Sequence, residues 1–163
     1  HATPSATPKR ALALRQIGQV RRAEGGVDAA LTAFAESRSQ AELLNRLDPA
    51  NDDHLFELGQ AEFWVGYVQY ERAELDAAAQ SMERYLGISQ ELLKRQPDNP
   101  DFTLELSYAL SNIGTIETTL TAVSTTGTGR APRPRWTISG TRTSSSCRVR
   151  VCSSQPRWPS SSP

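Results

Sequence analysis

The sequence predicts an all-α protein, a fragment of an α-solenoid made of tandem antiparallel helix pairs with a disordered C-terminal tail. First, residues 49–66 read PANDDHLFELGQAEFWVG and residues 97–114 read PDNPDFTLELSYALSNIG, so a pattern recurs at an offset of 48 residues. Second, apolar residues recur within each copy at the spacing of one helix face. Third, the composition changes abruptly near residue 118. An internal repeat of this length is typical of stacked helical units.

Charge divides the chain at the same place. The 163 residues carry no net charge, but residues 1–118 hold all 18 acidic residues against 11 Lys or Arg, which gives −7. Residues 119–163 hold seven Arg and no acid, and 18 of these 45 residues are Ser or Thr. We therefore expect a disordered leader at 1–10, helical repeats at 11–118 and a disordered low-complexity tail at 119–163.

Three segments of the chain align without gaps at the 48-residue offset. The shared positions are Ala13, Ala61 and Ala109; Ile17, Val65 and Ile113; Gly18, Gly66 and Gly114; and Val20, Val68 and Ile116. One chance match would not keep a single register across three copies. The units are expected near residues 11–50 and 51–98, with an incomplete third unit at 99–118.

The first unit is expected to contain two helices, because Gly25-Gly26 interrupts the helical pattern. The second helix is predicted at 27–47 from its apolar periodicity. Its inward residues are Leu31, Phe34, Ala41 and Leu44. Pro49 ends the unit, because proline disfavours helical geometry in the residue before it.

The second unit begins at Asn51, a capping residue followed by acids that suit the exposed N–H groups of a helix start. Its first helix carries an apolar stripe made of Leu58, Ala61, Val65 and Val68. Its second helix is predicted at 75–95, with Leu75, Ala78, Met82 and Leu92 inward, and Pro97 ends it.

The third unit starts at Asn99 and lacks a second helix. Leu106, Leu110 and Ile113 are therefore expected to be partly exposed, and this uncapped end offers a route to self-association.

The recurring glycine has a mechanical interpretation. Glycine inside a helix costs about 1 kcal/mol relative to Ala, so its repetition indicates that the partner helix crosses closely there. The alternative is that each glycine is merely tolerated.

These features resemble the tetratricopeptide repeat family. That family places a small residue, usually Gly, at position 8 of each unit, then Ala, a large apolar residue and a closing proline. The matching residues are Gly18, Ala30, Phe34 and Pro49, and then Gly66, Ala78, Met82 and Pro97. The family's usual aromatic at position 4 is missing, and the period exceeds the usual 34 residues. Lengthened second helices would absorb that difference.

The resemblance implies that the first helices line a concave groove that binds a protein segment. The residues at the groove positions are Leu12, Arg15, Gln19 and Arg22; Gln60, Phe63, Tyr67 and Tyr70; and Tyr108, Ser111 and Thr115. For the aromatic rings, the alternative is that neighbouring repeats cover them, above all Trp64 at the edge of the face. The arginines favour an acidic peptide, because guanidinium pairs well with carboxylate.

Few residues indicate other chemistry. His54 stands among helix-start acids, which favours a solvated first turn over a metal site. Cys147 and Cys152 have neither a second cysteine pair nor a nearby histidine. No phosphate-binding glycine loop or nucleophile elbow occurs, so neither an enzyme nor a cofactor is expected. No apolar run approaches the roughly 20 residues that span a bilayer, and we expect a cytoplasmic protein without membrane partners.

The tail has two competing interpretations. Its arginines could bind the phosphates of nucleic acid, although they are scattered and lysine is absent. Alternatively, the tail is out-of-frame sequence. Read from the third base of the Pro134 codon, residues 134–145 can be respelled as ALDDFRDSYELL, an amphipathic helix similar to residues 28–44.

The sequence thus leaves three hypotheses for function. The first is a protein-interaction scaffold within a larger, bacterial-type signalling or regulatory protein, since the chain lacks an initiator Met. The second is a nucleic-acid-binding adaptor that acts through the tail. The third is the scaffold end of an enzyme.

Overall fold

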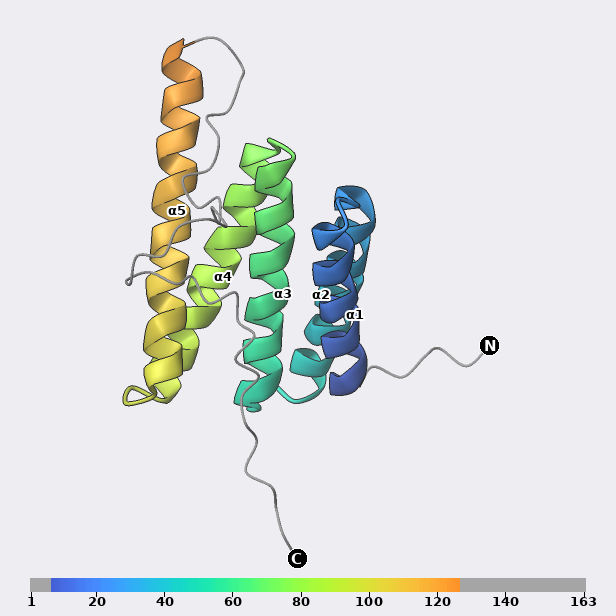
Figure 1. Ribbon diagram of the computed structural model, residues 1–163. Helices are drawn as coiled ribbons and strands as arrows, with labels where there is room; N and C mark the ends of the chain where they lie inside the picture. Colours follow the sequence, from blue (N-terminus) through green and yellow to red (C-terminus); the bar gives the residue numbers. More distant parts are fainter. Residues whose placement is uncertain (1–6, 127–163) are drawn as a thin grey trace, which may run out of the picture. The chain divides into compact units, whose positions relative to one another are not determined.

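Five α-helices make up the part of the chain that the computed structural model describes, residues 7–126. They are α1 (Pro8–Ala23), α2 (Val27–Leu47), α3 (Asp52–Glu71), α4 (Leu75–Arg95) and α5 (Pro100–Thr126). Each helix packs against the next one in the chain, and consecutive helices run antiparallel (Figure 1). No strand occurs within residues 7–126. The predicted all-α fold of tandem helix pairs is confirmed, and the tail beyond residue 126 lies outside the described residues.

The helices α2 and α4 begin and end at the predicted residues, whereas α1 begins earlier than expected. Residues 8–10 belong to α1 and not to a disordered leader. The side chain of Thr7 accepts a hydrogen bond from the backbone N–H of Arg10 at 3.2 Å, and Pro8 occupies the first turn. A threonine cap followed by proline is a common helix start. Thr7 and Pro8 therefore indicate the start of α1 in the sequence, although the prediction did not use them.

The helix α5 is longer than predicted, because it continues to Thr126 where the tail was expected to begin at residue 119. Ile116 is buried, and Leu120 and Val123 are half-buried at helical spacing after it. The hydroxyl of Thr119 bonds to that of Tyr70 on α3 at 2.9 Å. The Ser and Thr side chains also bond to carbonyls one turn back, which satisfies their hydroxyls within the helix. The predicted disorder of residues 119–126 is therefore wrong.

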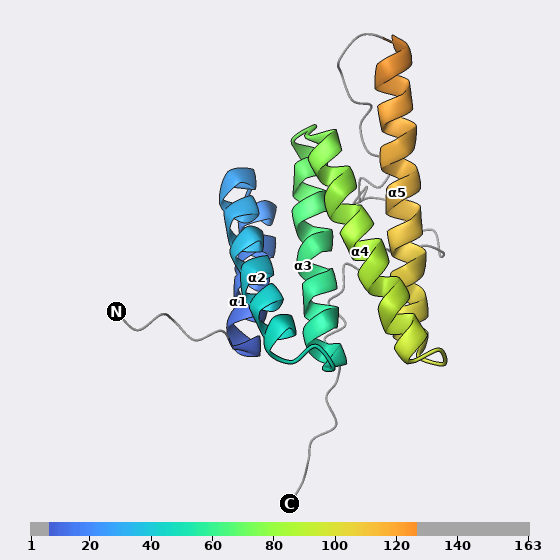
Figure 2. The ribbon, with the colours of Figure 1, turned by 180° about the vertical axis from the view of Figure 1, so that it is seen from behind.

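The first helices of the units, α1, α3 and α5, lie on one side, and the second helices, α2 and α4, lie on the other (Figures 1 and 2). From behind, α4 crosses obliquely from α3 toward α5 (Figure 2). Each second helix thus contacts two first helices, that of its own unit and that of the next unit. This arrangement buries both apolar faces of α2 and α4.

The recurring glycine marks the point where a second helix crosses its own first helix. A Cβ atom at Gly18 would lie 2.6–2.8 Å from three ring atoms of Phe34. At Gly66 it would lie 3.2 Å from the Cε of Met82, which holds the same register as Phe34. At Gly114 no described atom lies within 4 Å. The predicted close crossing is confirmed in the two complete units.

The core between the first two units forms around the ring of Phe34. It stacks on Trp64 with ring centroids 5.3 Å apart and planes 12° apart. Ala30, Val65 and Val68 complete this cluster, and all five side chains are buried. Trp64 is 7% exposed, so the neighbouring unit covers its ring. Trp64 therefore belongs to the core, as the alternative interpretation held.

A buried carboxylate on α3 forms ion pairs with both second helices. Glu62 on α3 is 2% exposed and lies 2.9 Å from Arg84 of α4 and 3.6 Å from Arg38 of α2. Two guanidinium groups compensate the desolvation of this carboxylate, which unpaired would be costly. The ion pairs thus connect α2 and α4 through α3.

Within residues 7–126, no second helix follows α5 in the third unit. Leu110 is 54% exposed, and Leu106 and Ile113 are half-buried. Their predicted partial exposure is confirmed.

The turns between the helices of each unit repeat the same backbone conformation. Gly25 has φ = +84°, and Ala73, 48 residues later, has φ = +60°. Only glycine adopts this left-handed region without steric cost. The second unit therefore carries local backbone strain that the first does not.

Substitution of the register glycine by alanine should have opposite effects in the first and third units. Gly18→Ala should lower the free energy of unfolding by about 1–3 kcal/mol, because the buried Phe34 ring cannot yield without repacking. Gly114→Ala should raise it by up to about 1 kcal/mol, because alanine favours the helix and meets no neighbour. Urea unfolding followed by circular dichroism measures both. Equal effects at the two sites would contradict the proposed crossing.

The positive-φ turn gives a second pair of substitutions. Ala73→Gly should raise the free energy of unfolding, and Gly25→Ala should lower it, each by about 1 kcal/mol. No described atom lies within 4 Å of a Cβ at Gly25, so the change reports backbone strain alone. Thermal unfolding of both variants and of the double variant tests this, and a destabilised Ala73→Gly protein would refute it.

Candidate protein-interaction face

The predicted groove residues lie on the side of the first helices, which we term the first-helix face. It comprises Arg15, Gln19 and Arg22 on α1; Gln60, Phe63, Tyr67 and Tyr70 on α3; and Tyr108 and Ser111 on α5. The fold therefore brings residues of three units onto neighbouring helices. Their individual environments differ, because some of them hold those helices together.

Between α1 and α3, both arginines of the face are paired with acids. Arg15 bonds to Glu57 with an N–O distance of 3.1 Å. Arg22 bonds to Glu71 at 2.7 Å and donates a second bond to the hydroxyl of Tyr67 at 2.9 Å. Its guanidinium carbon also lies 4.5 Å from the centre of the Tyr67 ring, a cation–π contact. The positive charge of the first unit is thus compensated by the second.

These contacts shift two pKa values. The hydrogen bond to Glu71 raises the pKa of Arg22 further above neutrality. Burial raises the pKa of the Tyr67 hydroxyl, although the neighbouring arginine opposes the shift. Arg22 therefore stays charged and Tyr67 stays neutral at physiological pH, and the pair presents a cation and a hydroxyl dipole.

Between α3 and α5, the predicted groove residues Gln60 and Tyr70 are buried, at 6% and 4% exposure. Gln60 donates to the carboxylate of Glu105 at 2.8 Å, and Tyr70 bonds to Thr119. The expectation that the Tyr70 ring lines an open groove is therefore wrong. The resemblance assigned Tyr70 to the groove, but the next first helix, α5, covers that position.

Glu105 is the centre of a buried polar cluster that joins three helices. It accepts hydrogen bonds from Gln60 of α3 and from the hydroxyl of Tyr85 of α4. Burial raises the pKa of the Glu105 carboxyl, against the opposing effect of these two donors and of Arg15. The cluster fixes α5 against the second unit.

Aromatic rings remain at the centre of the face. Phe63 is half-buried, with its ring centre 5.9 Å from that of Tyr67 and 5.6 Å from that of Tyr85. Tyr67 is also half-buried. Gln19 precedes Arg22 by one turn, and its Nε2 donates no hydrogen bond to any described residue. Phe63 and Tyr67 thus supply the apolar surface of the face, whereas the Nε2 donor of Gln19 is buried.

On α5, Tyr108 is half-buried and Ser111 is exposed. Tyr108 makes a contact beyond those described above. The two residues lie one turn apart on the last first helix, so they extend the face into the third unit.

Sequence reasoning missed the acids that complete the face, Glu57, Glu71 and Glu105, and also missed Tyr85. Arg15 pairs with Glu57 across 42 residues, and Arg22 pairs with Glu71 across 49. A search for opposite charges separated by about one repeat length, on neighbouring first helices, would have found both pairs.

Other chemistry is sparse on the described part of the chain. The Nδ1 atom of His54 is buried without a hydrogen-bond partner there, so this side chain is less solvated than expected. Within residues 7–126, no three His, Cys, Asp or Glu side chains are grouped to hold a metal ion. None of the helices described is long and apolar enough to cross a membrane. The cysteine pair lies outside these residues.

Comparison of the chain with protein-family models, curated proteins and solved structures finds no match.

The raised pKa of Glu105 predicts a pH-dependent stability. The folded protein holds this proton more tightly than the unfolded chain does, so the stability linked to Glu105 is fully present below the unfolded pKa of about 4.3 and is lost as the pH rises through the folded pKa. The free energy of unfolding of Glu105→Gln, relative to that of the original protein, should therefore increase as the pH rises from 4 to 7. Urea unfolding of both proteins at several pH values measures the difference, and a difference independent of pH would contradict the prediction.

Proposed function

We propose that this chain is a protein-interaction scaffold of the tetratricopeptide-repeat type, which binds a partner segment across the first-helix face. The supporting observation is the half-buried pair Phe63 and Tyr67 at the centre of a face formed by three units. Aromatic side chains that are held in place but retain accessible surface are typical of residues that dominate binding energy. Few other described residues offer chemistry that competes with this role.

The geometry divides the predicted site into two groups. Phe63, Tyr67 and Gln19 can contact a partner, with Tyr108 and Ser111 at the α5 end. Gln60 and Tyr70 instead act by holding α5 against α3, so they shape the face without presenting themselves to a ligand. The partner segment would lie across the first helices, with its apolar side chains on the aromatic pair.

The charge of the partner also needs revision. Arg15 and Arg22 suggested an acidic peptide, but each already has a glutamate partner at hydrogen-bonding distance. A carboxylate from a ligand would have to displace Glu57 or Glu71. We therefore propose a partner chosen by apolar and aromatic side chains that contact Phe63 and Tyr67. A cytoplasmic setting within a larger regulatory protein suits this role.

The nucleic-acid alternative depends on the basic tail. The helices carry a net charge of −7 over residues 1–118, which would repel phosphate. The scaffold hypothesis is favoured for that reason. A salt titration of binding to a DNA duplex, with and without residues 127–163, separates the two hypotheses.

Selection of a displayed library of 16-residue peptides on the full chain tests the proposal. Peptides with apolar or aromatic anchors should be enriched, and Phe63→Ala and Tyr67→Ala should each weaken their binding by at least about tenfold. Leu47→Ala is the matched control, because this side chain is 72% exposed at the end of α2 and should leave binding unchanged. Fluorescence anisotropy provides the affinities.

Tyr70→Ala separates scaffolding from contact. It should lower the free energy of unfolding by about 3 kcal/mol or more, because it removes a buried ring.

Selected peptides that bind the Phe63 and Tyr67 variants as tightly as the original protein would place the site elsewhere.

A further inference from the structure

The outer side of α1 carries an exposed apolar stripe, at positions that are buried in the second unit and buried or half-buried in the third. Ile17 is 48% exposed and Val20 is 57% exposed. The residues 48 positions later, Val65 and Val68, are 1% and 0% exposed. The same position of the third unit, Ile116, is 1% exposed.

In the other units, a preceding second helix covers this stripe. Val65 and Val68 belong to the cluster that Phe34 of α2 completes, and α5 packs in the same way against α4. The interface between a second helix and the following first helix therefore occurs twice in the described chain. The outer side of α1 has the apolar residues of that interface, and no helix of the described part of the chain packs on them.

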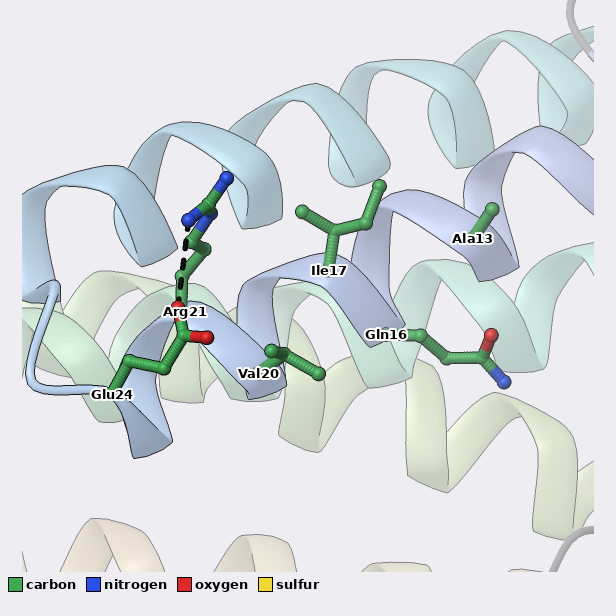
Figure 3. Close-up of a pocket in the computed structure, with 6 residues that line it drawn as sticks. All are labelled: Ala13, Gln16, Ile17, Val20, Arg21 and Glu24. Carbon is green, nitrogen blue, oxygen red and sulfur yellow. Dashed lines mark hydrogen bonds and ion pairs between the residues drawn. The ribbon is translucent and has the colours of Figure 1, made fainter.

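The surface of α1 is hollowed at this point. A shallow cavity of about 430 Å³ is lined by α1 and its C-cap alone (Figure 3). Its lining residues are Ala13, Gln16, Ile17, Val20, Arg21 and Glu24. Arg21 and Glu24 form an ion pair at 3.4 Å at one end, and Ala13, Ile17 and Val20 line the rest together with Gln16 (Figure 3).

We propose that this face of α1 binds an amphipathic helix of the α2 and α4 type, antiparallel to α1 and in the register that α2 adopts on α3. The occupant presents an apolar seam to Ile17 and Val20. Its first turn lies near Glu24, since α2 likewise places its first turn at the end of α3. The inference concerns a different face from the aromatic pair and does not depend on the proposed function.

The charges of α1 specify one feature of this helix. Arg72, at the end of α3, forms an ion pair with Asp28 in the first turn of α2. At the corresponding position α1 has Glu24, so the charge is reversed. The occupant therefore carries a basic residue where α2 has Asp28, because an acid there would face Glu24.

A fusion of the full chain tests the proposal. A copy of residues 51–98 is placed directly before Thr3, because Thr3 corresponds to Asn51 at the 48-residue offset and to Asn99 at twice that offset. The copied α4 helix then arrives at α1 in register. We expect the Tm to rise by roughly 5–10 °C and the amides of α1 to exchange at least about tenfold more slowly than in the unfused chain.

Two sets of variants give the test its specificity. Ile17→Glu with Val20→Glu should abolish both gains in the fusion, yet leave the Tm of the unfused chain nearly unchanged, because both side chains are exposed there. In the copied helix, Asp76→Lys should raise the Tm further, because the new lysine can form an ion pair with Glu24. Adding Glu24→Lys should reverse that increase.

Three results would overturn the proposal. The first is a folded fusion in which α1 exchanges as fast as in the unfused chain. The second is an unfused chain that sediments as a dimer and becomes monomeric with Ile17→Glu, which would make a second copy the occupant. If the fused unit does not fold, a shorter fusion with a copy of residues 75–98 should give the same slower amide exchange in α1. The third contradicting result is unchanged amide exchange of α1 in that shorter fusion.

Discussion

In the two complete units, the contact between a glycine of the first helix and a bulky side chain of the second helix is the constraint on which the rest of the packing depends. Phe34 fills the space left at Gly18, and Met82 fills the same space at Gly66. The bulky side chain of one unit then reaches the following first helix, where Phe34 stacks on Trp64. The missing side chain thus sets both the crossing within a unit and the packing between units.

A second constraint acts on the opposite side of the first helices. There, ion pairs and hydrogen bonds connect residues about one repeat length apart, such as Arg22 with Glu71 and Gln60 with Glu105. Each pair lets a polar residue of one unit satisfy a polar residue of the next. The first-helix face is therefore partly a structural interface, and Phe63, Tyr67, Tyr108 and Ser111 keep accessible surface beside it.

The fold could be predicted because it rests on local and periodic features. Apolar spacing, capping residues and prolines gave α2 and α4 their bounds, and the glycine register gave the crossing. The environment of the face could not be predicted in the same way, because burial of Tyr70 depends on where α5 lies. A helical wheel orients a residue within its own helix and carries no information about the neighbouring helix. The extension of α5 to Thr126 was missed for a related reason, since Thr119 gains its partner from α3.

The two sides of the first helices differ in how they respond to the solvent. The core cluster around Phe34 is apolar, so its contribution to stability hardly changes with ionic strength. The pairs Arg15–Glu57 and Arg22–Glu71 are ionic and keep some exposure to solvent, so salt weakens them to a limited extent. Rising ionic strength therefore loosens one side of the array while the other side holds. The contact between α1 and α3 therefore depends on ionic strength more than the packing of α2 on α3 does.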